Sequence, residues 1–195
     1  MIQADDMFKA FEPHREDAVV IVTGTGGKHW ADHTTKQNRD LNMGGAMGHT
    51  TSAALGLALG LPDEKVVLFD SEGALLMNLG IIATIAGQKP KNFLHLLMDN
   101  ECYATTGGQP VPNSQDINYA GMAKEAGYTA AYSFDNIEDF TTNIGNIMKE
   151  EGPVFVAMKM VPEVENEPIG MRPRRGVTRS RAESITALRS ELGIS

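Results

Sequence analysis

Four apolar segments, separated by turns, loops and helical patterns, limit this chain to few architectures. They cover residues 18–23, 65–70, 93–99 and 153–160, and they are continuous and rich in β-branched residues. Such runs are typical of strands that are buried on both faces. Strands that alternate with helices predict a parallel sheet joined by crossover helices. The sequence therefore predicts an α/β fold, namely a doubly wound and mainly parallel sheet.

The segments between these strands carry the periodicity of helices. Helices are expected over 5–15, 30–37, 50–61, 74–87, 117–126, 137–150 and 181–192, with a further short strand over 129–133 and a loop over 100–113. After Pro162 the composition shifts to proline, glycine and arginine. We therefore expect one domain over 1–162, and over 163–195 an arm with a final helix that packs on a partner subunit.

Composition excludes several classes of function. The net charge of -8 argues against nucleic acid and against an anionic membrane surface as partners. The N-terminal residues do not have the pattern of a signal peptide, and the chain has no apolar run of about 18 residues that would span a membrane. The single cysteine, Cys102, allows no intrachain disulfide. We therefore expect a cytoplasmic protein.

Three turns follow the predicted strands at the edge of the sheet where open α/β folds bind ligands. They begin at Thr23, Ser71 and Asp99. In the second turn, Gly73 at a helix start would expose N–H groups to a phosphate, and Glu72 beside it would repel that phosphate unless a cation lies between them. Asn100 could add a second oxygen ligand. This spacing indicates a Mg²⁺–diphosphate site, although a glutamate in a first helical turn and an asparagine after a strand are also ordinary structural residues.

Three motifs resemble the C-terminal, diphosphate-binding domain of thiamine-diphosphate enzymes. They are MGGAMGHTTSAALGLALG, EGALLMNLGIIATIAGQKPKNFLHLLMDN and YATTGGQP. The resemblance is greatest to sulfopyruvate and phosphonopyruvate decarboxylases, and the third motif is specific to that subgroup. It implies the thiamine-diphosphate-binding fold, with thiamine diphosphate and Mg²⁺ as cofactors.

The resemblance also implies the metal ligands. Glu72 stands where the family's Gly-Asp-Gly motif has its aspartate, and Asn100 stands at the family's asparagine. The third ligand is the backbone carbonyl of the residue two positions on, here Cys102. Serine replaces a glycine at position 71, and glutamate is one methylene longer than aspartate, so we expect metal binding with an adjusted geometry.

By the same resemblance, Gly44 and Gly45 belong to a turn that cradles the aminopyrimidine ring, with backbone hydrogen bonds at Gly45 and Met47. Met47 would be the apolar wedge that bends the cofactor, although alone it would read as a core methionine. Further cofactor contacts are implied at Thr25, Gly26, Gly73, Ala74, Leu75, Asn100 and Tyr103.

Histidines offer one candidate catalytic residue. His49 follows the cradle and could face the substrate, although a lone histidine, like His29 or His33, is usually structural. The thiol of Cys102 has no basic neighbour in the sequence and is not expected to act as a nucleophile. In this family the glutamate that activates the cofactor lies on a pyrimidine-binding domain, and this chain is too short to hold both domains.

The expected protein is therefore the beta subunit of a hetero-oligomer with a pyrimidine-binding alpha subunit. It would decarboxylate a small anionic 2-oxoacid such as 3-sulfopyruvate, which arginines of the arm could reach. Two alternatives stay open. One is a carboligase similar to acetolactate synthase, and the other is a non-catalytic scaffold or regulatory subunit with a degenerate metal motif. A Rossmann dehydrogenase is disfavoured because no G-x-G-x-x-G motif stands at a first strand–helix turn.

Overall fold

The computed structural model of the chain describes residues 1–24, 26–43, 47–167, 171 and 179–194. Its main sheet has six strands in the order β2-β1-β3-β4-β8-β7, and every neighbouring pair runs parallel. The strands are β1 Val19–Val22, β2 Asp40–Leu41, β3 Val66–Ser71, β4 Phe93–Asp99, β7 Ala130–Phe134 and β8 Val154–Lys159. The predicted parallel α/β sheet is confirmed.

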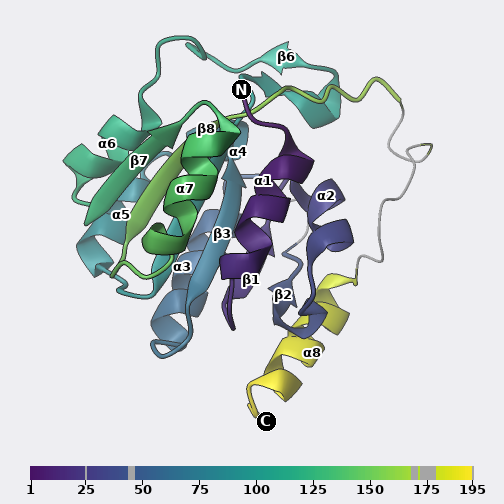
Figure 1. The fold of residues 1–195 in the computed structure, drawn as a ribbon, viewed down its shortest axis with the longest axis vertical. Coiled ribbons are helices and arrows are strands. Elements are labelled where there is room, and N and C mark those ends of the chain that lie inside the picture. Colours follow the sequence, from purple (N-terminus) through teal and green to yellow (C-terminus); the bar gives the residue numbers. More distant parts are fainter. Residues whose placement is uncertain (25, 44–46, 168–170, 172–178, 195) are drawn as a thin grey trace.

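Helices cover both faces of the sheet (Figure 1). On one face lie α1 Ala4–Phe11, α2 Gly26–His33 and α7 Ile137–Ile147, and on the other lie α3 Thr50–Gly60, α5 Ile81–Gln88 and α6 Tyr119–Ala126. The remaining elements are α4 Glu72–Met77, α8 Arg181–Glu191, the short strands β5 Cys102–Tyr103 and β6 Gln109–Pro110, and the 3₁₀ turns Glu12–His14, Gln37–Arg39 and Ala104–Thr106.

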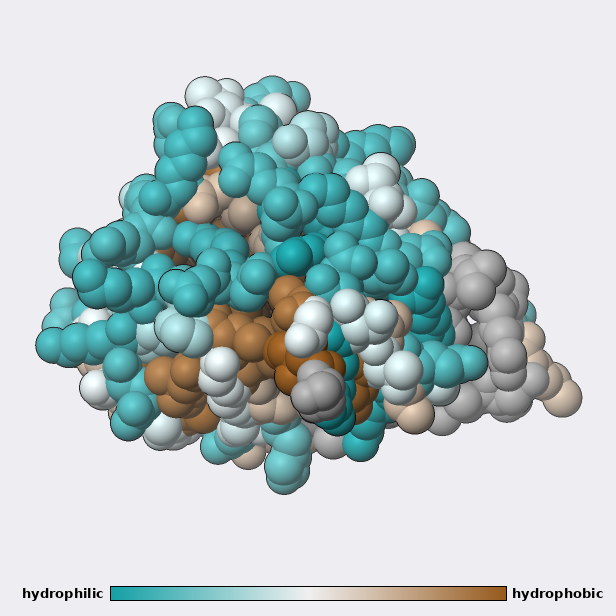
Figure 2. All heavy atoms as spheres, turned by 90° about the horizontal axis from the view of Figure 1, so that it is seen from below, coloured by the Kyte–Doolittle hydropathy of each residue, from teal (hydrophilic) through white to brown (hydrophobic). Residues whose placement is uncertain are grey.

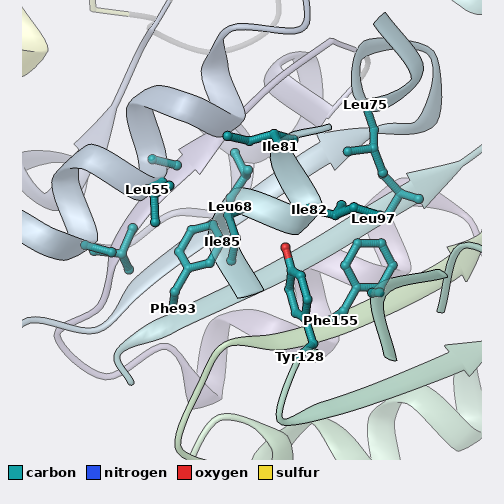
Figure 3. Close-up of a cluster of buried hydrophobic side chains, with 14 of the residues drawn as sticks. Leu55, Leu68, Leu75, Ile81, Ile82, Ile85, Phe93, Leu97, Tyr128 and Phe155 are labelled. Carbon is teal, nitrogen blue, oxygen red and sulfur yellow. The ribbon is translucent and has the colours of Figure 1, made fainter. Parts of the chain in front are cut away.

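Alternate residues of each central strand feed two separate cores. Leu68, Leu97 and Phe155 point toward α3 and α5, where Ile85 and its neighbours complete one apolar cluster (Figure 3). On the other face Phe69 meets Phe8 and Phe11 of α1, with ring centroids 5.0 and 4.9 Å apart. Because both faces of the strands are buried in this way, the strand order is fixed and the carboxyl ends of the strands form one edge.

The chain reverses direction across the sheet between β1 and β3. From β1 it goes outward to β2, and it then returns to place β3 on the opposite side of β1. Loops that leave two adjacent strands in opposite directions open a crevice at their carboxyl ends, which is where open α/β sheets bind ligands. The turns after β1, β3 and β4 all lie at this edge.

Three predicted elements differ from the structure. The helix expected over 74–87 is two helices, α4 and α5, because the Asn78 side chain leaves the helix and donates to the Gly48 carbonyl at 2.8 Å. The loop expected over 100–113 contains the antiparallel β5–β6 hairpin, in which Gly107 and Gly108 take positive φ values of 105° and 79°. Glycine adopts such values without steric cost.

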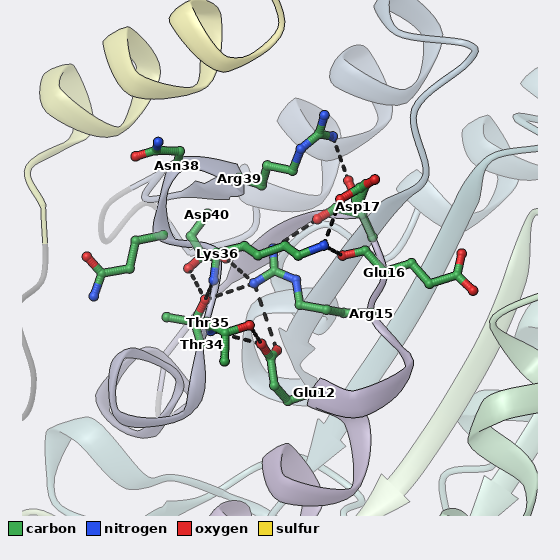
Figure 4. A network of polar contacts seen from close by, with 12 residues as sticks. Glu12, Arg15, Glu16, Asp17, Thr34, Thr35, Lys36, Asn38, Arg39 and Asp40 are labelled. Carbon is green, nitrogen blue, oxygen red and sulfur yellow. Dashed lines mark hydrogen bonds and ion pairs between the residues drawn. The ribbon is translucent and has the colours of Figure 1, made fainter.

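The helix expected over 30–37 begins earlier, at Gly26, and ends at His33. Its expected last turn is replaced by polar contacts (Figure 4). Thr34 accepts from Arg15 at 2.8 Å and donates to Asp40 at 2.6 Å, and Thr35 donates to Glu12 through both its backbone N–H and its hydroxyl. Threonine side chains that form such bonds compete with helical hydrogen bonding.

The C-terminal helix α8 lies beside the β2 edge of its own chain. Ser184 Oγ accepts from the backbone N–H of Asn42 at 3.1 Å, and the Asn42 side chain donates to the Arg179 carbonyl at 2.8 Å. Whether 163–195 also packs on a partner subunit stays a prediction. Within the described ranges, the structure has no helix long and apolar enough to cross a membrane.

Candidate cofactor and metal site

Glu72 is a buried carboxylate without a partner. It opens α4 directly after β3, and it is 1% exposed. Neither of its carboxyl oxygens accepts a hydrogen bond from any residue that the structure describes. Burial raises the pKa of Glu72 to about 7, and the charge of Asp99 adds to the rise. A buried carboxylate without donors is costly, so this position indicates a missing positive partner.

The turn after β4 lies against Glu72. No backbone N–H of the described residues meets hydrogen-bond geometry to this carboxylate, but those of Glu72 itself, Asn100 and Cys102 lie near enough to favour its charged form and hold the pKa of Glu72 below what burial alone would give. Asn100 is 7% exposed, and its Oδ1 accepts from the Cys102 N–H at 3.2 Å, which leaves one lone pair of that oxygen for another ligand. The structure thus brings Glu72 together with Asn100 and Cys102, although their role as metal ligands stays a prediction.

Glu101, in the middle of this turn, has a left-handed backbone with φ of 65°. Residues other than glycine adopt this region at a cost, and such strain persists where surrounding contacts hold it. Here Glu101 accepts from Lys159 at 2.9 Å and from Gln115 at 2.7 Å. The strained turn therefore keeps Asn100 and Cys102 facing Glu72.

Lys159 balances part of the negative charge. Its Nζ lies 2.8 Å from Asp99 and 2.9 Å from Glu101. Burial raises the pKa of Asp99, and the hydrogen bond from Lys159 opposes that rise. Lys159 pairs with these two carboxylates, and its pairing with them leaves the Glu72 charge uncompensated. No short motif marks Lys159, because its partners are about 60 residues away in the chain.

Met47, Gly73 and Tyr103 lie together at one wall of the site. A Cβ atom at Gly73 would lie 2.7 Å from Cε1 of the Tyr103 ring and 3.7 Å from Cε of Met47. Only glycine allows this close approach. Met47 is 39% exposed, so it is not a core methionine in this chain. Its position at the surface of the site fits the predicted wedge, which stays a prediction.

The segment after the cradle is fixed to α4. Gly48 has φ of 77°, and a Cβ atom there would lie 3.1 Å from Cβ of Met77. Its carbonyl accepts from Asn78. Gly44 and Gly45 of the predicted cradle, and Thr25 of the turn after β1, lie outside the described residues.

The ends of β1, β3 and β4 also meet. Gly26, Ser71 and Asn100 line one small pocket. A Cβ atom at Gly26 would lie 2.7 Å from Val22 Cγ1 and 2.9 Å from Met98 Sδ, which explains the glycine at the start of α2. Ala74 and Leu75 are buried in α4. The predicted cofactor residues that the structure describes therefore lie at one edge of the sheet, and Asn100 is both a predicted cofactor residue and a predicted metal ligand.

A second buried carboxylate lies two residues before Glu72. Asp70 is 1% exposed and accepts from the Thr51 hydroxyl at 2.6 Å, the Ser71 N–H at 2.9 Å and, more weakly, the Thr23 hydroxyl at 3.4 Å. His95 Nε2 lies 3.2 Å from Asp70 Oδ2, and the Tyr128 hydroxyl lies 3.3 Å from His95 Nδ1. This network ties β1, β3, β4 and α3 beneath the site, and the sequence analysis missed it.

The histidines differ in their surroundings. His49 is exposed, and its Nδ1 lies 3.1 Å from the backbone carbonyl of Met47, which lies at the wall of the site. The ring nitrogens of His29 lie 2.9 Å from Asp5 Oδ1 and 2.8 Å from Glu163 Oε2. His29 is therefore a structural residue, and a catalytic role of His49 stays a prediction.

The residues present fit a magnesium diphosphate group. Both oxygens of Glu72 need a cation, and Mg²⁺ takes only one or two protein carboxylates and fills its shell with phosphate oxygens and water. Among the described residues no cluster of three or more His, Cys, Asp or Glu side chains could hold a metal. A site with one carboxylate, one amide oxygen and one backbone carbonyl does not require such a cluster.

The sequence of this chain is similar to one protein family and to known decarboxylases. Residues 23–158 match the model of the thiamine pyrophosphate enzyme, C-terminal TPP binding domain. The chain is 34% identical over 143 residues to a phosphonopyruvate decarboxylase of Streptomyces hygroscopicus, covering 72% of this chain and 35% of that protein. It is 35% identical over 131 residues to a sulfopyruvate decarboxylase subunit beta of Methanothermobacter thermautotrophicus, covering 67% of each.

Among solved structures, benzoylformate decarboxylase from Polynucleobacter necessarius aligns with a TM-score of 0.70 at 16% identity. The alignment covers 86% of this chain and 34% of that one. At this identity the likeness concerns the fold alone. The chain thus spans about a third of the phosphonopyruvate decarboxylase and of this solved structure, but two thirds of the beta subunit.

Proposed function

Because this chain belongs to the thiamine pyrophosphate (thiamine diphosphate) enzyme family, as its C-terminal TPP binding domain, we propose that it is the diphosphate-binding subunit of a two-subunit decarboxylase. The enzyme would depend on thiamine diphosphate and Mg²⁺ and act on a small anionic 2-oxoacid such as 3-sulfopyruvate. One observation carries the proposal: Glu72 is buried at the start of α4, beside Asn100, and neither of its carboxyl oxygens has a donor in the part of the chain that the structure describes.

In this proposal Glu72, Asn100 and the Cys102 carbonyl hold Mg²⁺. The N–H groups at Gly73, Ala74 and Leu75 face the diphosphate, and Met47 and Tyr103 bound the rest of the cofactor. When bound, thiamine diphosphate supplies the electron sink that decarboxylation of a 2-oxoacid needs.

The residues of this chain would orient the bound group and keep water away from it. The β4–β5 turn and α4 bury the charged end of the site, which strengthens electrostatic contacts there. Glu72 must be ionised to hold the cation, so binding would release the proton that burial favours. The glutamate that acts on the pyrimidine ring is expected on the partner subunit.

The outer sides of α3 and α5 support a partner subunit. Neither helix contains a charged residue. The exposed positions of both helices are uncharged, namely Ser52, Gly56, Leu59 and Gly60 of α3 and Ala83, Thr84, Gly87 and Gln88 of α5. A surface helix normally carries charged and polar residues on its outer side, and a helix that is apolar all round is buried. These helices therefore suit a covered position in an assembly.

One face of the molecule carries exposed apolar side chains. Figure 2 shows apolar side chains gathered in one area of the face seen from below, bordered by polar ones. Large exposed apolar side chains include Leu59 of α3, Ile185 of α8 and Ile194. Contiguous apolar area of this kind marks interaction surfaces.

The partner proposal can be tested on α3. Nothing lies within 4 Å of a Cβ atom at Gly56, so Gly56→Arg should leave the isolated chain as stable as wild type. If α3 is covered, the variant should fail to co-purify with the alpha subunit. Thr142→Arg, on the exposed side of α7, is the matched control and should assemble normally. Normal assembly of both variants would remove α3 from the interface.

The activity is tested on the complex purified with its partner, in which CO₂ release is measured from 3-sulfopyruvate, phosphonopyruvate and pyruvate with thiamine diphosphate and Mg²⁺. We expect CO₂ release that is fastest with an anionic substituent and is lost on chelation of the metal. Acetolactate formation from pyruvate would support a carboligase instead. Absence of metal-dependent cofactor binding would leave only the scaffold. We place the complex in the cytoplasm, where a free thiol such as Cys102 stays reduced.

A further inference from the structure

Tyr119 carries one of the buried polar atoms that have no hydrogen-bond partner among the described residues. It is the first residue of α6, whose cap is Asn118, the acceptor of the Gly121 N–H at 2.8 Å. Tyr119 is 3% exposed, and its hydroxyl has no hydrogen-bond partner among the described residues. The ring packs in the same apolar cluster as Leu75 of α4 and Leu97 of β4. Packing therefore explains the ring of this residue but not its hydroxyl.

The Tyr119 hydroxyl lies within electrostatic range of residues of the candidate metal site. Burial raises the pKa of Tyr119, and the charges of Asp99 and Glu72 add to that rise, followed by Tyr103. These residues belong to the β4 end, the α4 start and the β5 wall of the site. In such surroundings the phenol keeps its proton and stays a hydrogen-bond donor. Neither carboxylate accepts that hydrogen bond.

Glu72 and Tyr119 are both buried and lie within electrostatic range of each other, so one bound group can supply what each of them lacks. Glu72 lacks a positive charge, and Tyr119 lacks an acceptor. A buried hydroxyl without an acceptor is rare in native proteins, because the lost hydrogen bond to water is not replaced. A cation bound to Glu72 that carries its own oxygen atoms would satisfy both groups, since one of those oxygens can accept from Tyr119.

We propose that Tyr119 is a further binding residue, whose hydroxyl donates a hydrogen bond to an oxygen of the magnesium diphosphate group held by Glu72. This inference rests on the proposed function. It assigns α6, and not only the turns after β1, β3 and β4, to the cofactor site. The sequence offered no signal for it, because Tyr119 follows Asn100 by 19 positions across the β5–β6 hairpin.

The test is Tyr119→Phe in the complex with the partner subunit, with thiamine diphosphate titrated calorimetrically in the presence of Mg²⁺. We expect the variant to bind thiamine diphosphate at least about tenfold more weakly, because it lacks a hydrogen bond to a charged group. Without cofactor and metal, the variant should unfold at the same temperature as wild type or a higher one, because it removes an unpartnered buried hydroxyl. A role in folding alone would not give this combination.

Tyr132→Phe is the matched control. Tyr132 lies on β7, the edge strand opposite β2, and its hydroxyl donates to Glu150 at 2.7 Å. Removal of this hydroxyl should leave cofactor affinity unchanged. Wild-type affinity in Tyr119→Phe, or a loss of stability without cofactor, would overturn the inference and leave the proposed function intact. If wild type itself shows no Mg²⁺-dependent binding, the proposed function fails and takes this inference with it.

Discussion

Asp70 and Glu72 are both 1% exposed, and they lie two residues apart, but their surroundings are opposite. Asp70 is the last residue but one of β3 and has donors on several sides, from Thr51, Ser71 and His95. Glu72 begins a helix, and neither of its oxygens has a hydrogen-bond donor within the described ranges. A buried carboxylate with donors belongs to the fold, whereas one without donors needs a partner that the chain does not contain. Asp70 therefore stabilises the fold beneath the site, whereas Glu72 is available for a ligand.

The largest effect is expected at Asp70. Asp70→Ala leaves His95 and the hydroxyl of Thr51 buried without their acceptor, which should cost about 3 to 5 kcal/mol of unfolding free energy. Urea denaturation of the full chain measures this. Asp63→Ala, at an exposed position, is the control and should change stability by less than about 0.5 kcal/mol. A loss below about 1 kcal/mol at Asp70 would erase the contrast between the two carboxylates.

The second effect concerns pH. The pKa of Glu72 rises from 4.5 to about 7 in the folded chain, so between these values the folded chain keeps a proton that the unfolded chain releases. Stability without metal should therefore fall as the pH rises from about 4.5 to 7, by about 3 kcal/mol in total. Glu72→Gln cannot titrate, so the stability of wild type should decline relative to this variant by that amount.

Denaturation in the presence of EDTA, at several pH values, measures the difference between wild type and Glu72→Gln. Above pH 7, Mg²⁺ and thiamine diphosphate should make wild type more stable than Glu72→Gln, because they stabilise only the chain that binds them. A difference that does not change with pH would mean that Glu72 is already compensated within the fold, as Asp70 is.

A smaller effect is expected at the wall of the site. Gly73→Ala places a methyl group 2.7 Å from the Tyr103 ring, which must move away. We expect the fold to persist and the cofactor affinity to fall on the order of tenfold, about 1.4 kcal/mol. Gly87→Ala, where nothing lies within 4 Å, is the control and should keep wild-type affinity. Unchanged affinity in Gly73→Ala would remove Tyr103 from the binding wall.

Local patterns predicted most of the fold. The β-branched runs predicted β1, β3, β4 and β8 to within a residue or two, because a strand buried on both faces is a continuous apolar run in the sequence. The division between α4 and α5 could not be read in this way, since it depends on a contact from Asn78 to Gly48, 30 residues away. The early end of α2 likewise depends on Arg15 and Glu12 of the N-terminal region.

The candidate site divides in the same manner. Glu72, Asn100 and Gly73 follow strands directly, so their spacing placed them at one edge of the sheet. Tyr119 and Lys159 enter the neighbourhood from distant elements through tertiary packing, and no short motif marks them. His95 sits inside an apolar strand, where the sequence shows only a polar residue in an apolar run. Its pairing with Asp70 depends on the parallel register of β3 and β4.

The central claim is that Glu72 holds a cation that bridges to a diphosphate. Isothermal calorimetry of the purified complex tests it most directly, with thiamine diphosphate titrated with and without Mg²⁺ into wild type, Glu72→Gln and, as control, the exposed Glu125→Gln. The account predicts Mg²⁺-dependent binding in wild type and the control, and at least about a hundredfold weaker binding, about 2.7 kcal/mol, in Glu72→Gln. Equal Mg²⁺-dependent affinity in all three proteins would contradict it.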